Sequence, residues 1–258
     1  VLQARLPESL EHSERALVLH RESGDRVSEG GTIGRMAWAY YRQGRIDESL
    51  EAYPRALAIH RELGNRRSEA VQLGNMALML CEQGREDQAL EYFQRALAIH
   101  RQVGNRRAEG GCLANMAILH IQNGRIDEAR KNYERSMSIH RSVGNRQGEA
   151  RILGSMANLF FYQGKHRDAL DHYERAIALF REINDRRGLG ENLGNLGDMQ
   201  YFQGNVSAAE KNLQEAIEVC HEVYSLCVGV FSGSLALIRQ EQGEIDEAHA
   251  LIDQAEPL

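Results

Sequence analysis

Apolar residues recur along the chain at the three- and four-residue spacing of amphipathic helices. Within residues 66–83, four of them occupy positions i, i+3, i+4 and i+7: Leu73, Met76, Ala77 and Leu80. This stripe predicts a helix that packs on one side. Gly84 ends that helix, and a second apolar stripe then runs to Val103. The pattern therefore predicts pairs of helices, and we name the two members helix A and helix B.

The pattern repeats every 40 residues. Its clearest markers are glycines at equal spacing: Gly44, Gly84, Gly124, Gly164 and Gly204. Gly243 follows after 39 residues, which places the loss of one residue in the stretch from Tyr224 to Leu226. A period of this length indicates a repeat architecture, in which each pair buries its apolar stripe against the next pair.

The period predicts an all-α fold, an α-solenoid of antiparallel helix pairs with about thirteen helices. We expect a partial unit at 1–24, five full units and a shortened last unit: 25–64, 65–104, 105–144, 145–184, 185–224 and 225–258. The first helix B is expected near 7–22. Gly104 suits the end of a helix and Asn105 the start of the next, a link that joins antiparallel helices. We expect a single solenoid, and the start at Val1 without Met suggests a piece of a longer protein.

Composition is compatible with this fold and disfavours several functions. With 42% hydrophobic and 26% charged residues the chain is foldable, and its net charge of −6 disfavours nucleic acid as a partner. No window has 18 apolar residues and the start does not resemble a signal peptide, so we expect a cytoplasmic protein without a membrane partner. We find no phosphate loop, nucleophile elbow or paired catalytic carboxylates, and we expect neither enzymatic activity nor a cofactor.

Histidine recurs with the unit, but its spacing argues against a metal site. Four histidines occupy the same place in successive units: His20, His60, His100 and His140. Equivalent places lie about 16 to 20 Å apart, whereas a bond from zinc to imidazole is about 2.1 Å. Phe180 and Cys220 fill the same place later in the chain. We therefore expect half-buried packing residues, and free thiols at the four cysteines.

The residues of one unit resemble the tetratricopeptide repeat. The resemblance rests on these positions: Leu73, Met76, Ala77, Leu80, Gly84, Ala89, Phe93 and Ala96. It recurs in five full units and partly in two more. The unit is six residues longer than the common form and has Arg101 where that form has proline. It is similar to the repeats of Pins and kinesin light chains, and more so to bacterial arrays beside kinase and ATPase modules. The resemblance implies a right-handed superhelix that binds a protein or peptide segment.

A second face of helix A varies between units, and we predict that it binds the partner. The candidate residues are Arg35, Trp38, Asn75, Leu78, Asn115, Ile118, Arg151, Asn158, Asn195 and Asp198. In tetratricopeptide arrays helix A lines the concave surface, and the asparagine that matches Asn75 commonly hydrogen-bonds the backbone of the ligand. An amide suits this role because it both donates and accepts. The alternative is that the asparagines bond only to neighbouring helices and that Trp38 fills a terminal gap.

Two other functions remain open on the sequence. The chain begins at the tail of one helix and stops at Pro257 inside what would be another unit, so that exposed ends of the solenoid would allow self-assembly into a homo-oligomer. The chain would also suit the sensor arm of a multidomain kinase or ATPase. A partner confined to the aromatic residues Phe161, Tyr162, Tyr201 and Phe202 is a further possibility for the binding surface.

Three local features predict details of packing. A small residue recurs inside helix A and predicts close approach of helices: Gly34, Gly74, Ala114, Gly154, Gly194 and Gly233. Arginine doublets begin three helices, at Arg66-Arg67, Arg106-Arg107 and Arg186-Arg187, and the nearby Glu69 and Glu109 favour local ion pairs over a basic edge. Pro54 lies inside a helix B, where we expect a local kink.

Overall fold

The computed structural model describes residues 6–221 and 225–255, and these residues form thirteen helices and no strand. The helices are α1 (Leu6–Glu22), α2 (Arg26–Arg42), α3 (Ile46–Glu62), α4 (Arg66–Glu82), α5 (Glu86–Gln102), α6 (Arg106–Gln122), α7 (Ile126–Ser142), α8 (Arg146–Tyr162), α9 (His166–Glu182), α10 (Arg186–Phe202), α11 (Val206–Cys220), α12 (Ser225–Glu241) and α13 (Ile245–Ala255). The prediction of an all-α solenoid is confirmed. Tyr224, at the expected loss of one residue, and Pro257 lie outside the described residues.

The connections between helices follow the predicted chemistry. Gly84 and Gly104 adopt φ of 69° and 65°, the left-handed conformation that glycine reaches without strain. The side chain of Asn105 then accepts a hydrogen bond from the backbone N–H of Ala108, which caps α6. Asn184 stands where other connections have glycine and is the described non-glycine residue with positive φ, 54°. The links at Gly84 and Gly104 thus stop one helix and start the next within three residues.

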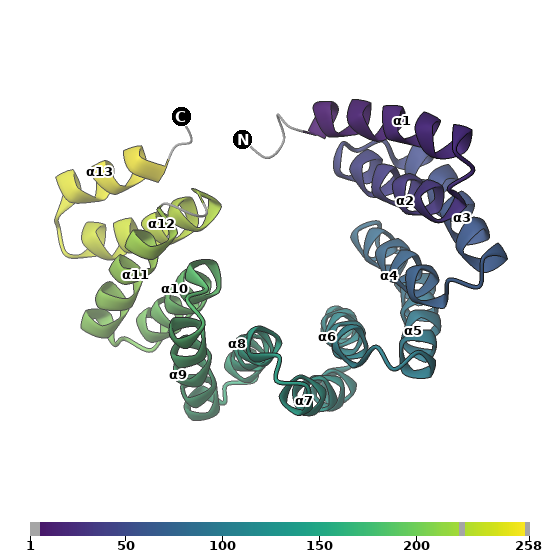
Figure 1. Ribbon diagram of the computed structural model, residues 1–258. Helices are drawn as coiled ribbons and strands as arrows, with labels where there is room; N and C mark the ends of the chain where they lie inside the picture. The colour runs from purple at the N-terminus through teal and green to yellow at the C-terminus, as the bar shows by residue number, and fades with distance from the viewer. Residues whose placement is uncertain (1–5, 222–224, 256–258) are drawn as a thin grey trace. The chain divides into compact units, whose positions relative to one another are not determined.

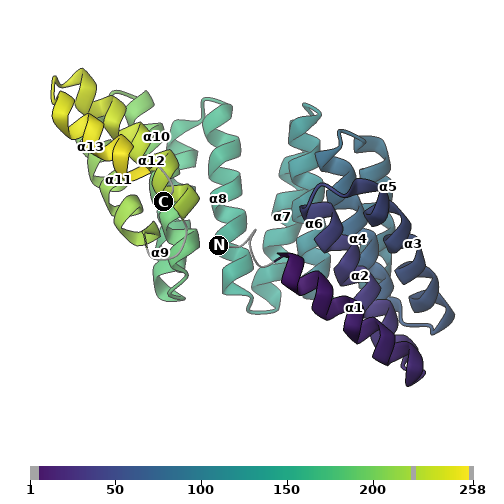
Figure 2. The same cartoon turned by 90° about the horizontal axis from the view of Figure 1, so that it is seen from above.

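The chain forms two compact units, which divide between Ile139 and His140. In the first unit the A helices α2, α4 and α6 line one side, and the B helices α3 and α5 line the other (Figure 1). Contacts join α2 to α4 and α4 to α6, and they also join α2 to α3 and α4 to α5. Figure 2 shows the helices of the first unit stacked in sequence order. The second unit repeats the alternation, with α8, α10 and α12 as A helices, and the organisation as one solenoid domain stays a prediction.

A large residue from each of four B helices anchors the core of its unit. Tyr53 and Phe93 are completely buried in the first unit, as are Tyr173 and Leu213 in the second, apart from 1% of Tyr173. The two residues of each unit are 40 residues apart, so they occupy equivalent places in successive repeats. Burying one such side chain stabilises the fold by about 1.5 to 3 kcal/mol. None of the helices in the described part of the chain combines the length and apolarity needed to cross a membrane.

The prediction that helices approach closely at the small residue of helix A is confirmed at three positions and wrong at two. A methyl group on Gly34, Gly154 or Gly194 would overlap a side chain of the next A helix, which is Gln72, Asn192 or Phe231 respectively. Nothing lies within 4 Å of a methyl group built on Gly74 or Gly233. Gln72 is 38 residues after Gly34, and the same step from Gly74 leads to Cys112, whose short side chain leaves space.

Pro54 does not interrupt its helix. The α3 helix includes every residue from Ile46 to Glu62, and Pro54 lies exposed on its surface. Proline lacks the N–H that would bond to the carbonyl of Leu50. The predicted local kink at this place stays a prediction.

Candidate functional site

An apolar row crosses the A helices of the first unit. Trp38 on α2, Leu78 on α4 and Ile118 on α6 are equivalent residues, one from each repeat. Trp38 and Leu78 pack against the core from one side while part of each remains exposed, and the ring of Trp38 lies 5.6 Å from that of Tyr41. Ile118 is 47% exposed. Since α2 contacts α4 and α4 contacts α6, these side chains form a row of equivalent, partly exposed apolar residues.

A polar row lies beside the apolar one, one turn earlier on each helix. Asn75 and Asn115 are half-buried, and neither amide forms a hydrogen bond with another described residue. Arg35 occupies the equivalent place on α2, is exposed, and donates to the hydroxyl of Thr32 over 2.8 Å. The two amides therefore keep both donors and acceptors for a group outside the chain. We name these six residues, Arg35, Trp38, Asn75, Leu78, Asn115 and Ile118, the A-helix face of the first unit.

Two of the four predicted residues of the second unit, Asn158 and Asp198, face other side chains of that unit. Asn158 accepts a hydrogen bond from the buried hydroxyl of Tyr173. Asp198 on α10 is near Ser234 on α12; burial raises the pKa of the Asp198 carboxyl, and the hydroxyl of Ser234 opposes the shift. Asn158 thus bonds to the neighbouring helix α9, which is the alternative stated above for the asparagines.

Two predicted residues of the second unit stay available to a partner. Arg151 on α8 is exposed. Asn195 on α10 is half-buried and, like Asn75 and Asn115, has no hydrogen bond to another described residue. The structure places the six other candidates on α2, α4 and α6 of the first unit, and it places Arg151 and Asn195 on the second unit.

Aromatic side chains gather at the C-terminal ends of α8 and α10. Tyr162 is 82% exposed and Phe202 is 75% exposed. The ring of Phe161 lies 5.7 Å from each of them and 5.8 Å from the ring of His166. Equivalent places on α2 and α4 hold Arg42 and Glu82, so this cluster distinguishes the second unit from the first.

Buried glutamates that the sequence reading missed hold the A helices in place. Four lie in the first turn of successive A helices: Glu29, Glu69, Glu109 and Glu149. Glu69, 3% exposed, accepts from Arg61 Nε over 2.7 Å and also from Arg66. The expected pair of Arg66 with Glu69 is confirmed, but Arg61 and the burial were not foreseen. The signal was an arginine eight residues before each of these glutamates.

The local pairing predicted for the arginine doublets fails at Arg67 and Arg107 but holds at Arg187, which pairs with Glu191. Arg66 and Arg106 bond to Glu69 and Glu109. Arg67 and Arg107 are exposed and form no ion pair with any described residue. The reason is helical geometry, because consecutive residues point about 100° apart and one glutamate cannot meet both arginines.

Of the recurring histidines, His20 is half-buried as expected, and His60, His100 and His140 are more buried than expected. His60 is 1% exposed and His100 is 3% exposed. Burial lowers the pKa of both imidazoles, and the nearby Glu69 and Glu109 oppose the shift. Among residues 6–221 and 225–255, the structure shows no group of three or more His, Cys, Asp or Glu side chains that could hold a metal.

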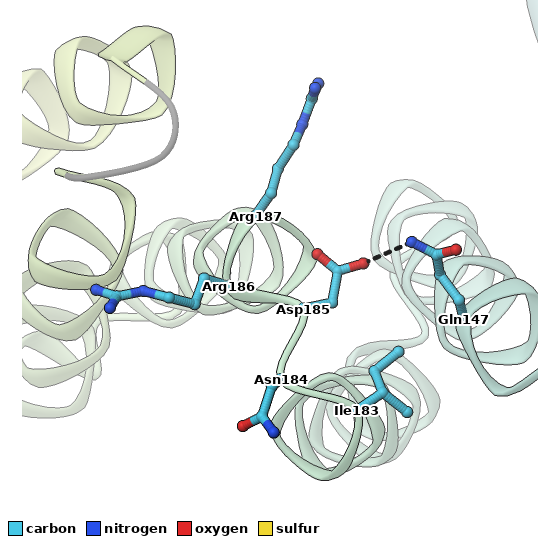
Figure 3. A pocket seen from close by; sticks show the side chains of 6 residues that line it. All are labelled: Gln147, Ile183, Asn184, Asp185, Arg186 and Arg187. Atoms are coloured by element: carbon cyan, nitrogen blue, oxygen red, sulfur yellow. Dashed lines mark hydrogen bonds between the residues drawn. The ribbon is translucent and has the colours of Figure 1, made fainter.

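A cavity of about 630 Å³ lies at the connection between α9 and α10, beside the start of α8. It is lined by Gln147, Ile183, Asn184, Asp185, Arg186 and Arg187. Figure 3 shows that Asp185 turns toward Gln147, whose amide donates to it over 2.9 Å, while the two arginines point in different directions. Arg187 pairs with Glu191 over 3.0 Å. The polar groups do not converge on one point, so this cavity is a weaker candidate than the A-helix face of the first unit.

Comparisons with known proteins agree with the fold. A family model described as tetratricopeptide repeat matches residues 29–102, 67–120, 110–182 and 150–222. No curated protein sequence matches the chain. The solved structure of BtubC (BKLC) from P. vanneervenii is similar, with a TM-score of 0.73 and 18% identity over 84% of this chain and 91% of that one.

Two further solved structures share the fold. One is a signal transduction ATPase with numerous domains and a tetratricopeptide repeat sensor, from Pyrococcus horikoshii, with a TM-score of 0.74 and 16% identity. The match covers 94% of this chain and 38% of the ATPase. The other is a Rap protein complexed with competence and sporulation factor, with a TM-score of 0.66 and 18% identity over 94% of this chain and 72% of that one. At such identities the likeness concerns the fold alone.

Proposed function

Since the chain belongs to the tetratricopeptide repeat family, we propose that it is an interaction scaffold whose first unit binds an extended peptide or protein segment. The segment would cross α2, α4 and α6 on the A-helix face of the first unit. Its role would be binding and not catalysis. The Rap protein that shares the fold was solved with a bound factor, which supports a binding role for such arrays. The cytoplasmic location stays a prediction.

The observation that carries this proposal is the pairing of two rows on three neighbouring helices. Asn75 and Asn115 have amides without internal hydrogen bonds, and an extended backbone offers the matching carbonyl and N–H groups. Trp38, Leu78 and Ile118 lie one turn away and are partly exposed. Neighbouring side chains of an extended segment point to opposite sides, so alternate residues would meet the apolar row while the backbone meets the amides.

The test uses peptides that are selected from a displayed random library for binding to the full chain. A fluorescein-labelled selected peptide is titrated with the wild type, with Asn115→Ala and with Asn75→Ala, and fluorescence anisotropy reports binding. Each substitution should weaken binding by about 1 to 3 kcal/mol, because a peptide group of the ligand loses its partner. The matched control is Gln94→Ala on α5, which removes an exposed amide from a B helix.

Two results would count against this binding surface. Equal affinities for the wild type, Asn75→Ala and Asn115→Ala would show that the amides do not hold the ligand. Equal losses in those variants and in Gln94→Ala would show that the effect is not local to the A-helix face. Trp38 is the single tryptophan of the chain, so a change in its emission on binding gives a second readout near α2.

Self-assembly is a second candidate, and the last helix gives it support. Ile252 on α13 occupies the place of the completely buried Leu213, yet it is 49% exposed. An association through this face would cover it. A head-to-tail contact with α1 would bring two B helices together and break the alternation, so we favour a symmetric contact between two copies of α13. Light scattering over a concentration series tests this, and Ile252→Glu should abolish any dimer that wild type forms.

The third possibility, a sensor arm of a multidomain ATPase or kinase, stays a prediction. The fold is shared with the sensor-bearing ATPase from Pyrococcus horikoshii, of which this chain matches 38%. A sensor arm would also bind its signal through a surface of the array. The peptide test above therefore applies to this possibility as well.

A further inference from the structure

Two buried thiols face each other where α11 packs against α12. Cys220, the last residue of α11, is completely buried, and Cys227, in the first turn of α12, is 5% exposed. Both belong to the same cluster of buried core residues, and the structure shows both as free thiols. Burial raises the pKa of each thiol, and each thiol also acts on the pKa of the other, so the two are close neighbours.

The repeat explains why the two cysteines face each other. Their equivalents one repeat earlier are Phe180 on α9 and Gly188 on α10, at steps of 40 and 39 residues. A methyl group on Gly188 would overlap the ring of Phe180, and one on Gly148 would overlap the ring of His140 in the same way. A side chain at this place of helix A therefore points at the last buried residue of the preceding helix B. In the final unit both places hold cysteine.

The connection beside these thiols lacks the turn residues of the other links between repeats. Elsewhere a glycine or Asn184 ends helix B, and an aspartate or asparagine caps the next helix A through its side chain. Those links are Gly24-Asp25, Gly64-Asn65, Gly104-Asn105, Gly144-Asn145 and Asn184-Asp185. At 221–224 the sequence reads His, Glu, Val and Tyr, which supplies neither kind of residue. The last pair of helices therefore follows a link without the residues that fix the others.

We propose that Cys220 and Cys227 form a reversible disulfide when hydrogen peroxide oxidises the chain, and that this bond stabilises α12 and α13 against local unfolding. The bond would close the loop 220–227, which limits how far α12 can separate from α11. A methyl group on Gly190 would overlap the sulfur of Cys220, so this thiol is also packed against α10. The inference concerns the second unit and does not depend on the peptide proposed for the first.

The reaction uses one molecule of hydrogen peroxide and the two thiols. The thiolate of Cys227, the more exposed of the two, attacks one peroxide oxygen. A sulfur–oxygen bond forms, the oxygen–oxygen bond breaks, and the leaving hydroxide combines with the proton lost by that thiol to give water. The thiolate of Cys220 then attacks the sulfenic sulfur, and hydroxide leaves with the proton of the second thiol as another water. Because burial raises the pKa of both thiols, few thiolates are present at neutral pH and the reaction is slow.

The experiment measures the thiols and the protection of the last helices before and after oxidation. The full wild-type chain is kept for several hours with an excess of hydrogen peroxide, alkylated in denaturant and digested with a protease that cleaves after glutamate. Cleavage at Glu218, Glu222 and Glu241 puts the two cysteines on separate peptides, 219–222 and 223–241, which mass spectrometry finds joined only if the disulfide has formed. Hydrogen–deuterium exchange of each helix is measured on the same samples, and again after reduction with dithiothreitol.

We expect the oxidised wild type to keep two of its four thiols and to yield the joined peptides. Amide exchange in α12 and α13 should slow at least about tenfold, because the bond suppresses local opening of the last helix pair. Exchange in α1 to α6 should stay the same, since these helices belong to the other unit. Dithiothreitol should restore all four thiols and the original exchange.

Two variants separate the bond from a general effect of peroxide. Cys227→Ala should show neither the joined peptides nor the slower exchange. Alanine suits this place, because Ala108 occupies the equivalent place of α6. The matched control is Cys112→Ala, which removes another buried cysteine and should respond to peroxide as the wild type does.

Three results would overturn the inference. Four alkylated thiols after oxidation would show that the bond does not form. Joined peptides that come from a covalent dimer on a non-reducing gel, or sulfinic acid at Cys227 without joined peptides, would show that the two thiols of one chain do not meet. A disulfide that forms without slower exchange in α12 and α13 would show that the bond does not stabilise the last helix pair.

Discussion

The ring of Phe231 on α12 packs directly over Gly194 on α10, where a methyl group would overlap it. Gly194→Ala should therefore destabilise the protein by about 1 to 3 kcal/mol, the usual cost of overpacking. Gly74 occupies the equivalent place on α4, where an added methyl group would have no neighbour within 4 Å. Gly74→Ala should therefore stabilise the protein by about 0.5 to 1 kcal/mol, because alanine favours the helix more than glycine does. Urea unfolding followed by circular dichroism measures both.

The pair of glycine variants contains its own control, because the two substitutions are chemically identical. Adding Phe231→Leu to Gly194→Ala should recover part of the lost stability, since the smaller side chain leaves room for the methyl group. Similar free energies of unfolding for Gly194→Ala and Gly74→Ala would show that the facing residue does not decide the cost.

Glu69 and its two arginines make a second prediction about stability. Glu69→Ala removes a buried carboxylate that Arg61 and Arg66 hold, and it should cost about 1 to 3 kcal/mol. The equivalent residue in α10 is Leu189, so the fold itself accepts an apolar side chain here. Glu69→Leu should therefore cost less than Glu69→Ala, because leucine fills the space while both arginines reach water. Equal costs for the two variants in urea unfolding would contradict this account.

Acid should weaken the fold through the buried histidines. Burial lowers the pKa of His60 and His100 below the ordinary 6.5, so the folded protein holds fewer protons there than the unfolded chain does. Their contribution is fully present above pH 6.5 and is lost as the pH falls through the folded pKa values. His60→Leu should flatten the fall in unfolding free energy between about pH 7 and pH 5.

The histidine prediction has a matched control at the surface. His249 lies exposed on α13, so that His249→Leu makes the same change of residue without removing a buried ring. Urea unfolding at several pH values measures the slope for each protein. A slope in His60→Leu equal to that of wild type would show that His60 does not titrate with unfolding.

The fold was predictable because the same pattern of apolar and turn residues recurs in successive units. Glycine recurs at places such as Gly84 and asparagine at places such as Asn105, and the structure shows the expected φ at the first and the expected cap at the second. The carboxylate of Glu69 was placed correctly beside Arg66. Its burial was not predictable from the helix alone, because Arg61 reaches it from the preceding helix across a turn.

The candidate site was less predictable, because residues at equivalent positions of helix A face different residues of helix B in different repeats. Asn158 and Ile118 are equivalent, but only Asn158 has both the polar side chain and a tyrosine hydroxyl within reach. The residue of helix B opposite is Tyr173 in that repeat, Phe93 in an earlier one and Leu213 in a later one. A comparison of helix A with helix B inside each repeat, and not only along helix A, would have separated the packing amide from the free ones.

That separation yields the prediction that tests the site most directly. Asn158→Ala leaves the hydroxyl of Tyr173 buried without its acceptor and should destabilise the fold by about 1 to 3 kcal/mol. Asn115→Ala removes an amide without internal hydrogen bonds and should change stability by no more than about 0.5 kcal/mol. Binding should show the reverse order, because the ligand loses a partner only at Asn115.

Four quantities are therefore measured: the free energy of unfolding and the peptide affinity of Asn158→Ala, and the same two quantities for Asn115→Ala. Tyr173→Phe combined with Asn158→Ala should recover part of the stability lost in Asn158→Ala, because no buried hydroxyl then lacks an acceptor. A large loss of stability in Asn115→Ala with affinity unchanged would assign Asn115 to helix packing. The same affinity loss in both variants would mean that the ligand also reaches the second unit, where Asn158 would have to release Tyr173 in order to bind it.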